Sequence, residues 1–199
     1  MRYFTISMAG TGVYKEKGSK FVSFIHPIKS LGMYNNFLKR YRLKYKNACH
    51  VCSAYRLYIN GQIIENAFDD GEPRGSSGLP ILNKLKKHEL VNISLYIVRY
   101  FGGTKLGISG LISSYGLAAE DSFLNISKKL WKPVKIIDIT HNYKYSKLIN
   151  IACLKFKGEI ANQDFNHKIQ TRVKIKVDLE FEFKKFLFEN SNGEISILL

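Results

Sequence analysis

The sequence predicts an α+β protein of two domains, and three observations support this. Several segments alternate apolar and polar residues as strands do, and others repeat apolar residues at helical spacing, with the two kinds segregated along the chain. A basic segment, Ser127–Pro133, precedes a second complete set of elements. Since 199 residues suffice for two small cores, we place the domains at residues 1–130 and 131–199.

Strands are expected in the first domain at Lys20–Ile28, Val51–Ile59, Gln62–Phe68 and around Val91–Ile97, and Asn60-Gly61 predicts a hairpin between the second and third. Helical spacing occurs at Tyr34, Phe37, Leu38, Tyr41 and Tyr45, then at Leu79, Leu82 and Leu85, and finally at Ile112, Tyr115, Ala119, Phe123 and Ile126. Two glycine loops, Asp69–Gly78 and Phe101–Gly110, connect these elements.

The second domain is expected to follow the order strand, helix, strand, strand, helix, strand. The segments are Val134–Asn142, Ser146–Phe156, Gly158–Asn166, Lys168–Val177, a helix containing Leu179, Phe183, Phe186 and Leu187, and Ile195–Leu198. Phe181 leaves a strand possible in place of the second helix. The βαββαβ order is the ferredoxin-like arrangement.

The chain carries a net charge of +15, most of it in the first two thirds. Up to Leu130 there are 19 Lys and Arg residues against 8 Asp and Glu, whereas from Trp131 onward there are 12 against 8. Such a basic field attracts nucleic acid or another polyanion. The alternative is codon drift in an AT-rich genome, because Lys outnumbers Arg 24 to 7 and Ile, Asn and Tyr are also frequent.

The apolar runs are shorter than the ~18 residues that a membrane span needs. The N-terminal segment is interrupted by Thr, Ser and Gly, unlike a signal peptide. Three cysteines, Cys49, Cys52 and Cys153, are an odd number and argue for a reducing compartment. We therefore expect a cytoplasmic protein with no membrane partner.

The loop Asp69–Gly78 places three carboxylates, those of Asp69, Asp70 and Glu72, within four residues. Such oxygens suit a hard cation like Mg²⁺, although the spacing does not match an EF-hand. The alternative is a structural turn in which Ser76 or Ser77 caps the helix that follows.

The segment Arg99–Gly110 lies between a predicted strand and a predicted helix, where backbone N–H groups and the helix start favour an anion. The residues expected to hold it are Arg99, Gly102, Gly103 and Lys105. The spacing matches neither a Walker A loop nor the dinucleotide fingerprint. The alternative is that these glycines serve the tight packing of a turn.

The motif Cys49-His50-Val51-Cys52 is similar to half of a zinc site, but the sequence has no second pair and a structural zinc site needs four ligands. We expect buried thiols here, with no metal and no cofactor. A Cys52–His50 nucleophile pair is the alternative.

Five cations follow one another along the first predicted helix: Lys39, Arg40, Arg42, Lys44 and Lys46. The tyrosines between them have core-like spacing, so the cations are expected on the solvent face. There they are either simply solvated or in contact with phosphates. Lys84, Lys86 and Lys87 are candidates to extend this patch.

Four segments together resemble the YigZ/IMPACT family. They are Lys17-Gly18-Ser19-Lys20-Phe21, His50-Val51-Cys52-Ser53-Ala54-Tyr55, the loop Asp69–Gly78, and Arg99–Gly110 followed by Leu111. Their order and spacing cover the chain from Lys17 to about Phe123. The set is specific, although no single segment is. The tail from Val134 resembles the family's ferredoxin-like C-terminal module.

The resemblance implies a ribosomal-protein-type βαβ domain, like domain IV of elongation factor G, followed by a domain like domain V of that factor. It also implies regulation of translation, because such folds handle RNA and ribosomal surfaces and the eukaryotic member IMPACT binds an activator of an amino-acid-starvation kinase. The residues that match the family pattern are His50, Asp70, Glu72, Arg99, Gly102 and Gly103. Gly75-Ser76-Ser77-Gly78 and Ser109 depart from it, and Lys105 is not uniform in the family.

We therefore expect a non-enzymatic, translation-associated regulator that binds RNA, the ribosome or a ribosomal factor. Its surface is expected to combine the glycine loop after Arg99 with the basic helix, and no catalytic residue is assigned. One alternative is a metal-assisted hydrolase or nucleotide-handling enzyme that uses His50, Asp69, Asp70, Glu72 and Arg99. Another is a regulator that binds only a protein partner.

Overall fold

The computed structural model describes residues 2–198 and shows two compact units. The first unit extends to Trp131, and the second begins at Lys132. Each unit combines an antiparallel sheet with helices packed on it, which confirms the predicted α+β fold class.

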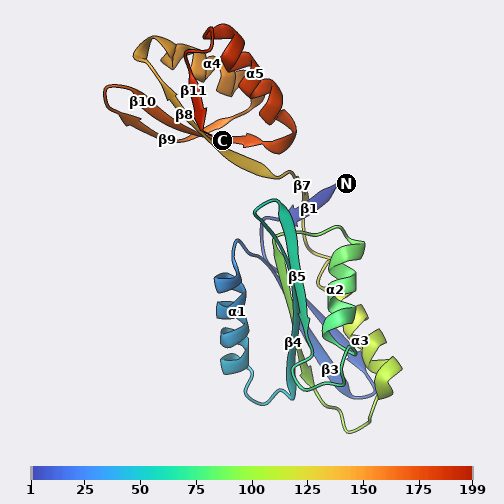
Figure 1. Cartoon of the computed structure of the whole chain (residues 1–199). Coiled ribbons are helices and arrows are strands. Elements are labelled where there is room, and N and C mark those ends of the chain that lie inside the picture. The colour runs from blue at the N-terminus through green and yellow to red at the C-terminus, as the bar shows by residue number, and fades with distance from the viewer. Residues whose placement is uncertain (1, 199) are drawn as a thin grey trace. The chain divides into compact units, whose positions relative to one another are not determined.

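An antiparallel sheet of five strands forms the centre of the first unit (Figure 1). Its strands are β2 (Gly10–Glu16), β3 (Ser19–Pro27), β4 (His50–Ile59), β5 (Gln62–Phe68) and β6 (Ile93–Tyr100). They lie in the order β2-β3-β6-β4-β5, so β6 is the middle strand. Two short strands, β1 (Tyr3–Ile6) and β7 (Lys128–Trp131), pair with each other outside this sheet.

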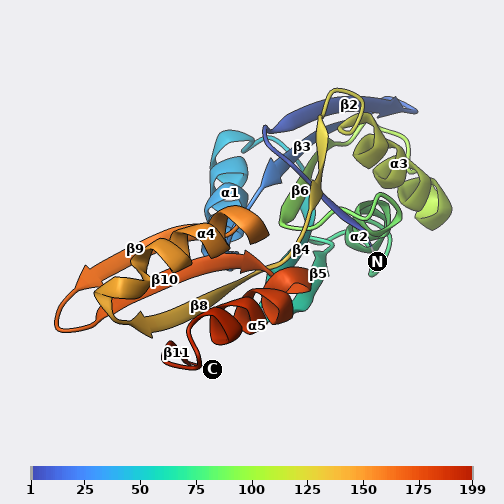
Figure 2. The same ribbon diagram turned by 90° about the horizontal axis from the view of Figure 1, so that it is seen from above.

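Helices cover both faces of the five-stranded sheet. α1 (Leu31–Lys44) lies on one face, and α2 (Gly78–Lys87) and α3 (Gly107–Asp121) lie together on the other (Figure 2). Side chains alternate along β6: Ile97 packs with the α2 and α3 core, whereas Val98 packs with the α1 core. None of the helices described between residues 2 and 198 is long and apolar enough to cross a membrane.

The middle strand and the helix after it differ in detail from the prediction. All of β6 except its last residue is buried, rather than alternately exposed, because helices cover both of its faces. The expected loop Phe101–Gly110 is shorter, since α3 already begins at Gly107. On α3, Tyr115 is buried as predicted, but Ile112 is exposed.

β1 and β2 lie in a segment for which the sequence analysis predicted no strand. β2 contains Gly10 and Gly12, which weaken its strand pattern. A Cβ at Gly12 would overlap the backbone of Asp121 and Ser122 at the end of α3. The position therefore needs glycine for close packing, and this need conflicts with the local strand signal.

The hairpin predicted at Asn60-Gly61 is present between β4 and β5. Both residues have positive φ angles, 50° and 86°, as a tight two-residue hairpin turn requires. The strands pair continuously from Ile59 and Gln62 onward.

The second unit has the βαββαβ order predicted from the sequence. Its elements are β8 (Val134–His141), η1 (Tyr143–Tyr145), α4 (Ser146–Phe156), β9 (Glu159–Phe165), β10 (Ile169–Lys176), η2 (Val177–Leu179), α5 (Glu180–Asn190) and β11 (Ser196–Leu198). The strands lie in the order β11-β8-β10-β9, as in a ferredoxin-like fold. Phe181 belongs to α5 and is exposed, so the strand alternative for this segment is wrong.

A stack of aromatic side chains fills the space between α1 and the sheet. The His26 ring lies in this stack with its centroid 4.0 Å from that of Phe37, and its Nε2 is 2.5 Å from the Tyr41 hydroxyl. Burial, and then the positive charge of Arg40, lower the pKa of His26 from 6.5 to about 4. At neutral pH the core therefore holds a neutral His26 that is hydrogen-bonded to the Tyr41 hydroxyl.

The low pKa of His26 predicts an acid-dependent loss of stability. Between pH 6.5 and about 4 the unfolded chain binds a proton at this residue that the folded chain does not. The free energy of unfolding should therefore fall as the pH falls through this range, and the contribution of His26 should level off below it. His26→Phe should flatten this dependence, at a cost of about 1 kcal/mol at neutral pH for the lost hydrogen bond.

Urea unfolding followed by Trp131 fluorescence measures this effect, because the Trp131 ring lies 4.8 Å from that of Tyr58 in the first unit. His167→Phe is the matched control, since His167 is exposed. An unchanged pH slope in His26→Phe would show that His26 is not the group responsible.

Candidate functional site

Asp69 organises the loop between β5 and α2. Its Oδ1 accepts hydrogen bonds of 2.8 Å from the Ser77 hydroxyl and the Gly78 N–H, and its Oδ2 accepts one of 2.8 Å from the Gly75 N–H. Burial alone would raise the pKa of Asp69, but these hydrogen bonds outweigh it and hold the pKa below its usual value. Asp69 therefore caps α2, the role predicted for Ser76 or Ser77, and neither serine makes a side-chain capping bond.

Asp70 ties the same loop to α1 and β4. Its carboxylate pairs with Arg42 of α1 and accepts a hydrogen bond of 2.7 Å from the Val51 N–H. Its backbone carbonyl lies 2.8 Å from Nδ1 of His50. Because a carbonyl only accepts, Nδ1 carries a proton, and Nε2 lies 3.9 Å from Oε1 of Glu72.

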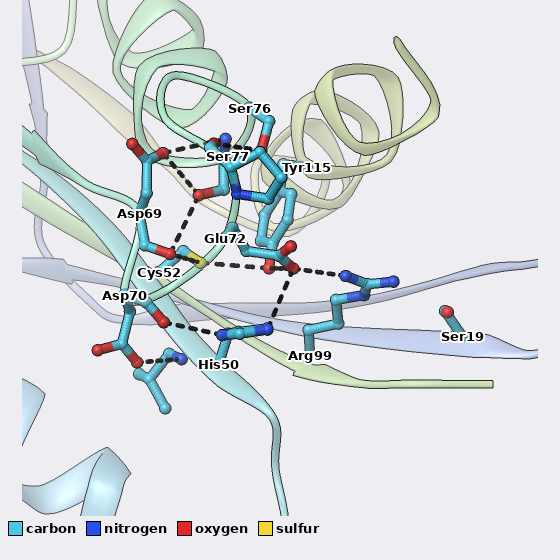
Figure 3. Close-up of polar contacts among 12 residues, drawn as sticks. Ser19, His50, Cys52, Asp69, Asp70, Glu72, Ser76, Ser77, Arg99 and Tyr115 are labelled. Carbon is cyan, nitrogen blue, oxygen red and sulfur yellow. Dashed lines mark hydrogen bonds and ion pairs between the residues drawn. The ribbon is translucent and has the colours of Figure 1, made fainter. Parts of the chain in front are cut away.

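Glu72 lies at the centre of a buried polar cluster (Figure 3). Its Oε1 is 2.6 Å from Nη1 of Arg99, 2.9 Å from the Tyr115 hydroxyl and 3.9 Å from Nε2 of His50. Only 3% of the Glu72 side chain and 7% of the Arg99 side chain are exposed. Each of these buried charges would be strongly destabilising without its partner. We call Glu72, Arg99, Tyr115 and His50 the Glu72 cluster, and it fastens the loop to β6.

Arg99 also packs between two aromatic rings. Its guanidinium carbon lies 5.6 Å from the centroid of Phe21 and 5.8 Å from that of Phe101. Its Nε is buried and has no hydrogen-bond partner among the residues described. Arg99 thus uses one nitrogen for Glu72 and leaves another donor unsatisfied, which is unusual for a buried group.

The two cysteines of the motif differ: Cys52 is a buried, protonated thiol, and Cys49 is exposed. Burial, above all, raises the pKa of Cys52 to about 12, and its Sγ donates a 3.0 Å hydrogen bond to the Asp69 carbonyl. A thiol in this state is unsuited to act as a nucleophile. The prediction that both thiols of the motif are buried is wrong for Cys49, which is exposed.

Across residues 2–198, no group of three or more His, Cys, Asp or Glu side chains is arranged to hold a metal ion.

The paired glycines after β6 have different roles. A Cβ at Gly102 would overlap the backbone of Gly18 and Ser19, and the Gly102 N–H donates to the Ser19 hydroxyl at 3.2 Å. Gly103 has a φ of 86° with open space around it, and Lys105 is exposed. Gly102 is therefore committed to packing, whereas Gly103 and Lys105 remain accessible.

The cations of α1 lie on the opposite face of the sheet from the Glu72 cluster. Val98 points toward α1, so Arg99, the next residue on β6, points toward α2 and α3. There Arg99 and Tyr115 of α3 both donate hydrogen bonds to Glu72. The surface expected to join the glycine loop and the basic helix therefore divides into two separate regions.

Two lysines missed by the sequence analysis extend the α1 side. Lys15 of β2 and Lys20 of β3 are directly opposite each other in the sheet. Lys20 precedes Phe21, which packs with the α2 and α3 core, so Lys20 points to the α1 side. We define the α1 basic surface by its six cations: Lys15, Lys20, Lys39, Arg40, Arg42 and Lys44.

Tyr115 and Ser19 also belong to the site, but the sequence analysis assigned neither of them a functional role. Helical spacing placed Tyr115 in the core, which is correct, yet its hydroxyl donates to Glu72 from 43 positions away. Ser19 lies within a segment that carries the family resemblance, and this is the one signal that marked it.

Comparison with known families finds one that matches the region containing the site. The Impact N-terminal domain family matches residues 17–123, a region that contains the whole Glu72 cluster. The chain belongs to this family. The resemblance seen in the sequence, from Lys17 to about Phe123, is thereby confirmed.

Impact-family relatives match nearly the whole chain. IMPACT family member YvyE of Bacillus subtilis (strain 168) is 28% identical, over 98% of this chain and 89% of its own length. IMPACT family member YigZ of Escherichia coli (strain K12) is 27% identical, over 94% of this chain and 93% of its own length. A crystal structure of a hypothetical protein has a TM-score of 0.73 at 24% identity and covers 99% of this chain and 96% of that one, which supports the fold.

The contact between Gly102 and Gly18 predicts a large effect of a single methyl group. Gly102→Ala should lower the free energy of unfolding by at least about 2 kcal/mol, because backbone on both sides must move. Gly32→Ala is the control: a Cβ there meets only the Ser30 hydroxyl, at 3.6 Å, and a gain of up to about 1 kcal/mol is expected. Equal effects of the two substitutions, measured by urea unfolding, would contradict the packing role of Gly102.

The buried ion pair predicts that removing one charge is worse than removing both. Glu72→Gln should cost about 3–5 kcal/mol by leaving Arg99 buried and uncompensated. Combining it with Arg99→Met should cost clearly less than the sum of the two single substitutions. Tyr115→Phe, which removes only one hydrogen bond to Glu72, should cost about 1 kcal/mol. Additive losses in urea unfolding would mean that the two charges do not depend on each other.

Proposed function

We propose that this Impact-family protein binds RNA through the α1 basic surface and acts in the regulation of translation, as the family resemblance implies. The observation that carries the proposal is the state of charge on α1. Lys39, Arg40 and Lys44 are exposed, α1 contains no Asp or Glu, and none of these three cations forms an ion pair within residues 2–198. Such free cations are available to phosphates.

Several other cations of the first unit are paired internally. Arg56 and Lys86 pair with Glu65, Lys84 and Lys87 pair with Glu120, and Arg99 pairs with Glu72. The lysines of α2, which the sequence analysis considered as an extension of the patch, therefore pair with Glu65 and Glu120 and lie on the other face. The α1 basic surface, in contrast, keeps Lys39, Arg40 and Lys44 unpaired among the residues described.

An aromatic ring stands beside these cations at the end of α1. Tyr45 is half-buried, its ring centroid lies 5.6 Å from that of Phe24, and the Lys44 ammonium lies 5.2 Å from its centre. Single-stranded RNA binds surfaces that combine cations with aromatic rings on which bases stack. This combination favours RNA over a purely electrostatic partner.

The rival reading as a metal-assisted hydrolase receives less support from the same residues. Asp69 is occupied by backbone donors of its own loop, Asp70 by Arg42 and β4, and Glu72 by Arg99. Each carboxylate that resembled a catalytic group therefore has a structural partner.

RNA binding is tested by filter binding of the full chain to single-stranded ribosomal RNA fragments at increasing salt. The triple variant Lys39→Gln, Arg40→Gln, Lys44→Gln should bind at least tenfold more weakly at low salt. It should also reduce the slope of log affinity against log salt by about 2, because each lost phosphate contact contributes about 0.7.

The matched control removes three exposed lysines of the second unit: Lys147→Gln, Lys155→Gln and Lys168→Gln. It lowers the net charge equally, so an equal loss of affinity would show that bulk charge, not the α1 basic surface, drives binding. Salt-independent binding would argue against phosphate contacts.

Sedimentation of lysate through a sucrose gradient tests the link to translation. The chain should migrate with ribosomal particles, and nuclease treatment should release it. Co-migration with protein factors that survives nuclease would instead support a regulator that binds protein alone.

A further inference from the structure

A pocket of about 270 Å³ lies beside the start of α3. Its walls are mainly apolar and come from Pro73, Phe101, Leu106, Ile108 and Leu111. Arg99, Glu72 and Lys105 supply its polar side. The pocket is on the α2–α3 face, so it is separate from the α1 basic surface to which RNA binding is assigned.

The start of α3 differs from the starts of the other two helices in this unit. At α1 the Ser30 hydroxyl accepts a hydrogen bond of 3.2 Å from the Met33 N–H, and at α2 the Asp69 carboxylate accepts one from Gly78. At α3 no side chain caps the helix, and its first turn contains no acidic residue. Its first N–H groups therefore keep their hydrogen-bonding capacity and the positive end of the helix dipole.

This uncapped helix start lies at the pocket, since Gly107 and Ile108 are among the residues that line it. The second polar feature there is Arg99, which is 6% exposed and has a buried Nε without a partner in the described chain. The uncapped N–H groups call for a hydrogen-bond acceptor, and the Arg99 side chain, which lines the pocket, adds a cationic donor group beside them. Lys105, exposed beside them, adds positive charge.

We propose that this pocket binds a ligand with a terminal carboxylate on an apolar body. The carboxylate caps α3 as Asp69 caps α2, next to Arg99 and Lys105. Arg99 offsets the negative charge of Glu72, with which it is paired, so the net positive charge at the pocket comes from Lys105 and the start of α3. The apolar body packs against Phe101 and Ile108, which are both exposed.

The size and lining of the pocket decide the ligand class. A volume of about 270 Å³ falls just below the ~300–1,000 Å³ of sites for drug-sized molecules, so the body is comparable to a leucine or phenylalanine side chain. A phosphate of RNA fits less well, because its sugar neighbours would leave the apolar walls unmatched. The same chemistry is offered by a free aliphatic or aromatic acid and by the C-terminal residue of a peptide.

The test is an NMR titration of the ¹⁵N-labelled full chain with two acid and amide pairs. One pair is 3-phenylpropionate and 3-phenylpropionamide, and the other is acetyl-Gly-Gly-Phe with a free or an amidated C-terminus. The acids should shift the amide signals of residues 107–110 and should bind at least tenfold more tightly than their amides. Tighter binding of the peptide acid assigns the site to C-termini, and tighter binding of 3-phenylpropionate assigns it to free acids.

Ile108→Glu and Ile112→Glu form a matched pair of variants. Ile108 is 62% exposed and lines the pocket, whereas Ile112 is 44% exposed, lies one turn further along α3 and does not line it. Ile108→Glu should weaken acid binding at least tenfold by placing a negative charge in the pocket, and Ile112→Glu should leave it unchanged. Lys105→Gln should weaken it about threefold or more.

Three outcomes would overturn the proposal: acids and amides that bind equally, no shifts at residues 107–110, or equal effects of the two glutamate variants. Filter binding of Ile108→Glu to RNA should match that of the wild type. A failed carboxylate titration with intact RNA binding therefore rejects the pocket and leaves the proposed function standing.

Discussion

The buried ion pair between Glu72 and Arg99 holds two loops together at one end of the five-stranded sheet. Glu72 belongs to the loop after β5, and Arg99 lies near the end of β6, directly before the second glycine loop. Because both charges are almost fully removed from water, each would be strongly destabilising without the other. The pair therefore fixes both loops, although the two residues are 27 positions apart.

The neighbouring carboxylates complete the same construction. Asp69 caps α2, Asp70 joins the loop to α1 and β4, and Glu72 bonds to β6 and α3. Three acidic residues within four positions therefore fasten one loop to five surrounding elements. The cluster resembles a metal or catalytic site in the sequence because carboxylates at close spacing are common to both. A structural loop differs from a metal or catalytic site because its carboxylate oxygens already accept hydrogen bonds from the protein, as these oxygens do.

The sheet divides the first unit into two regions with different chemistry. Residues of β6 alternate between the faces, so Arg99 points to the α2–α3 side, and its neighbours Val98 and Tyr100 point to the α1 side. Free cations and a partly exposed tyrosine gather on the α1 side, which suits a polyanion. Apolar walls around an uncapped helix start occur on the other side, which suits one small anionic group.

Local patterns in the sequence were sufficient to predict β3, β4, β5 and the order of elements in the second unit, since alternation, helical spacing and the Asn60-Gly61 turn depend on neighbouring residues. The family resemblance, rather than local patterns, marked His50, Asp70, Glu72 and Arg99 as candidate site residues. Only the tertiary structure decided that Glu72 pairs with Arg99 and Tyr115, and that Arg99 and α1 lie on opposite faces. Contacts across 27 or 43 positions depend on how the strands are ordered and which helices cover them, and residue spacing along the chain does not contain that information.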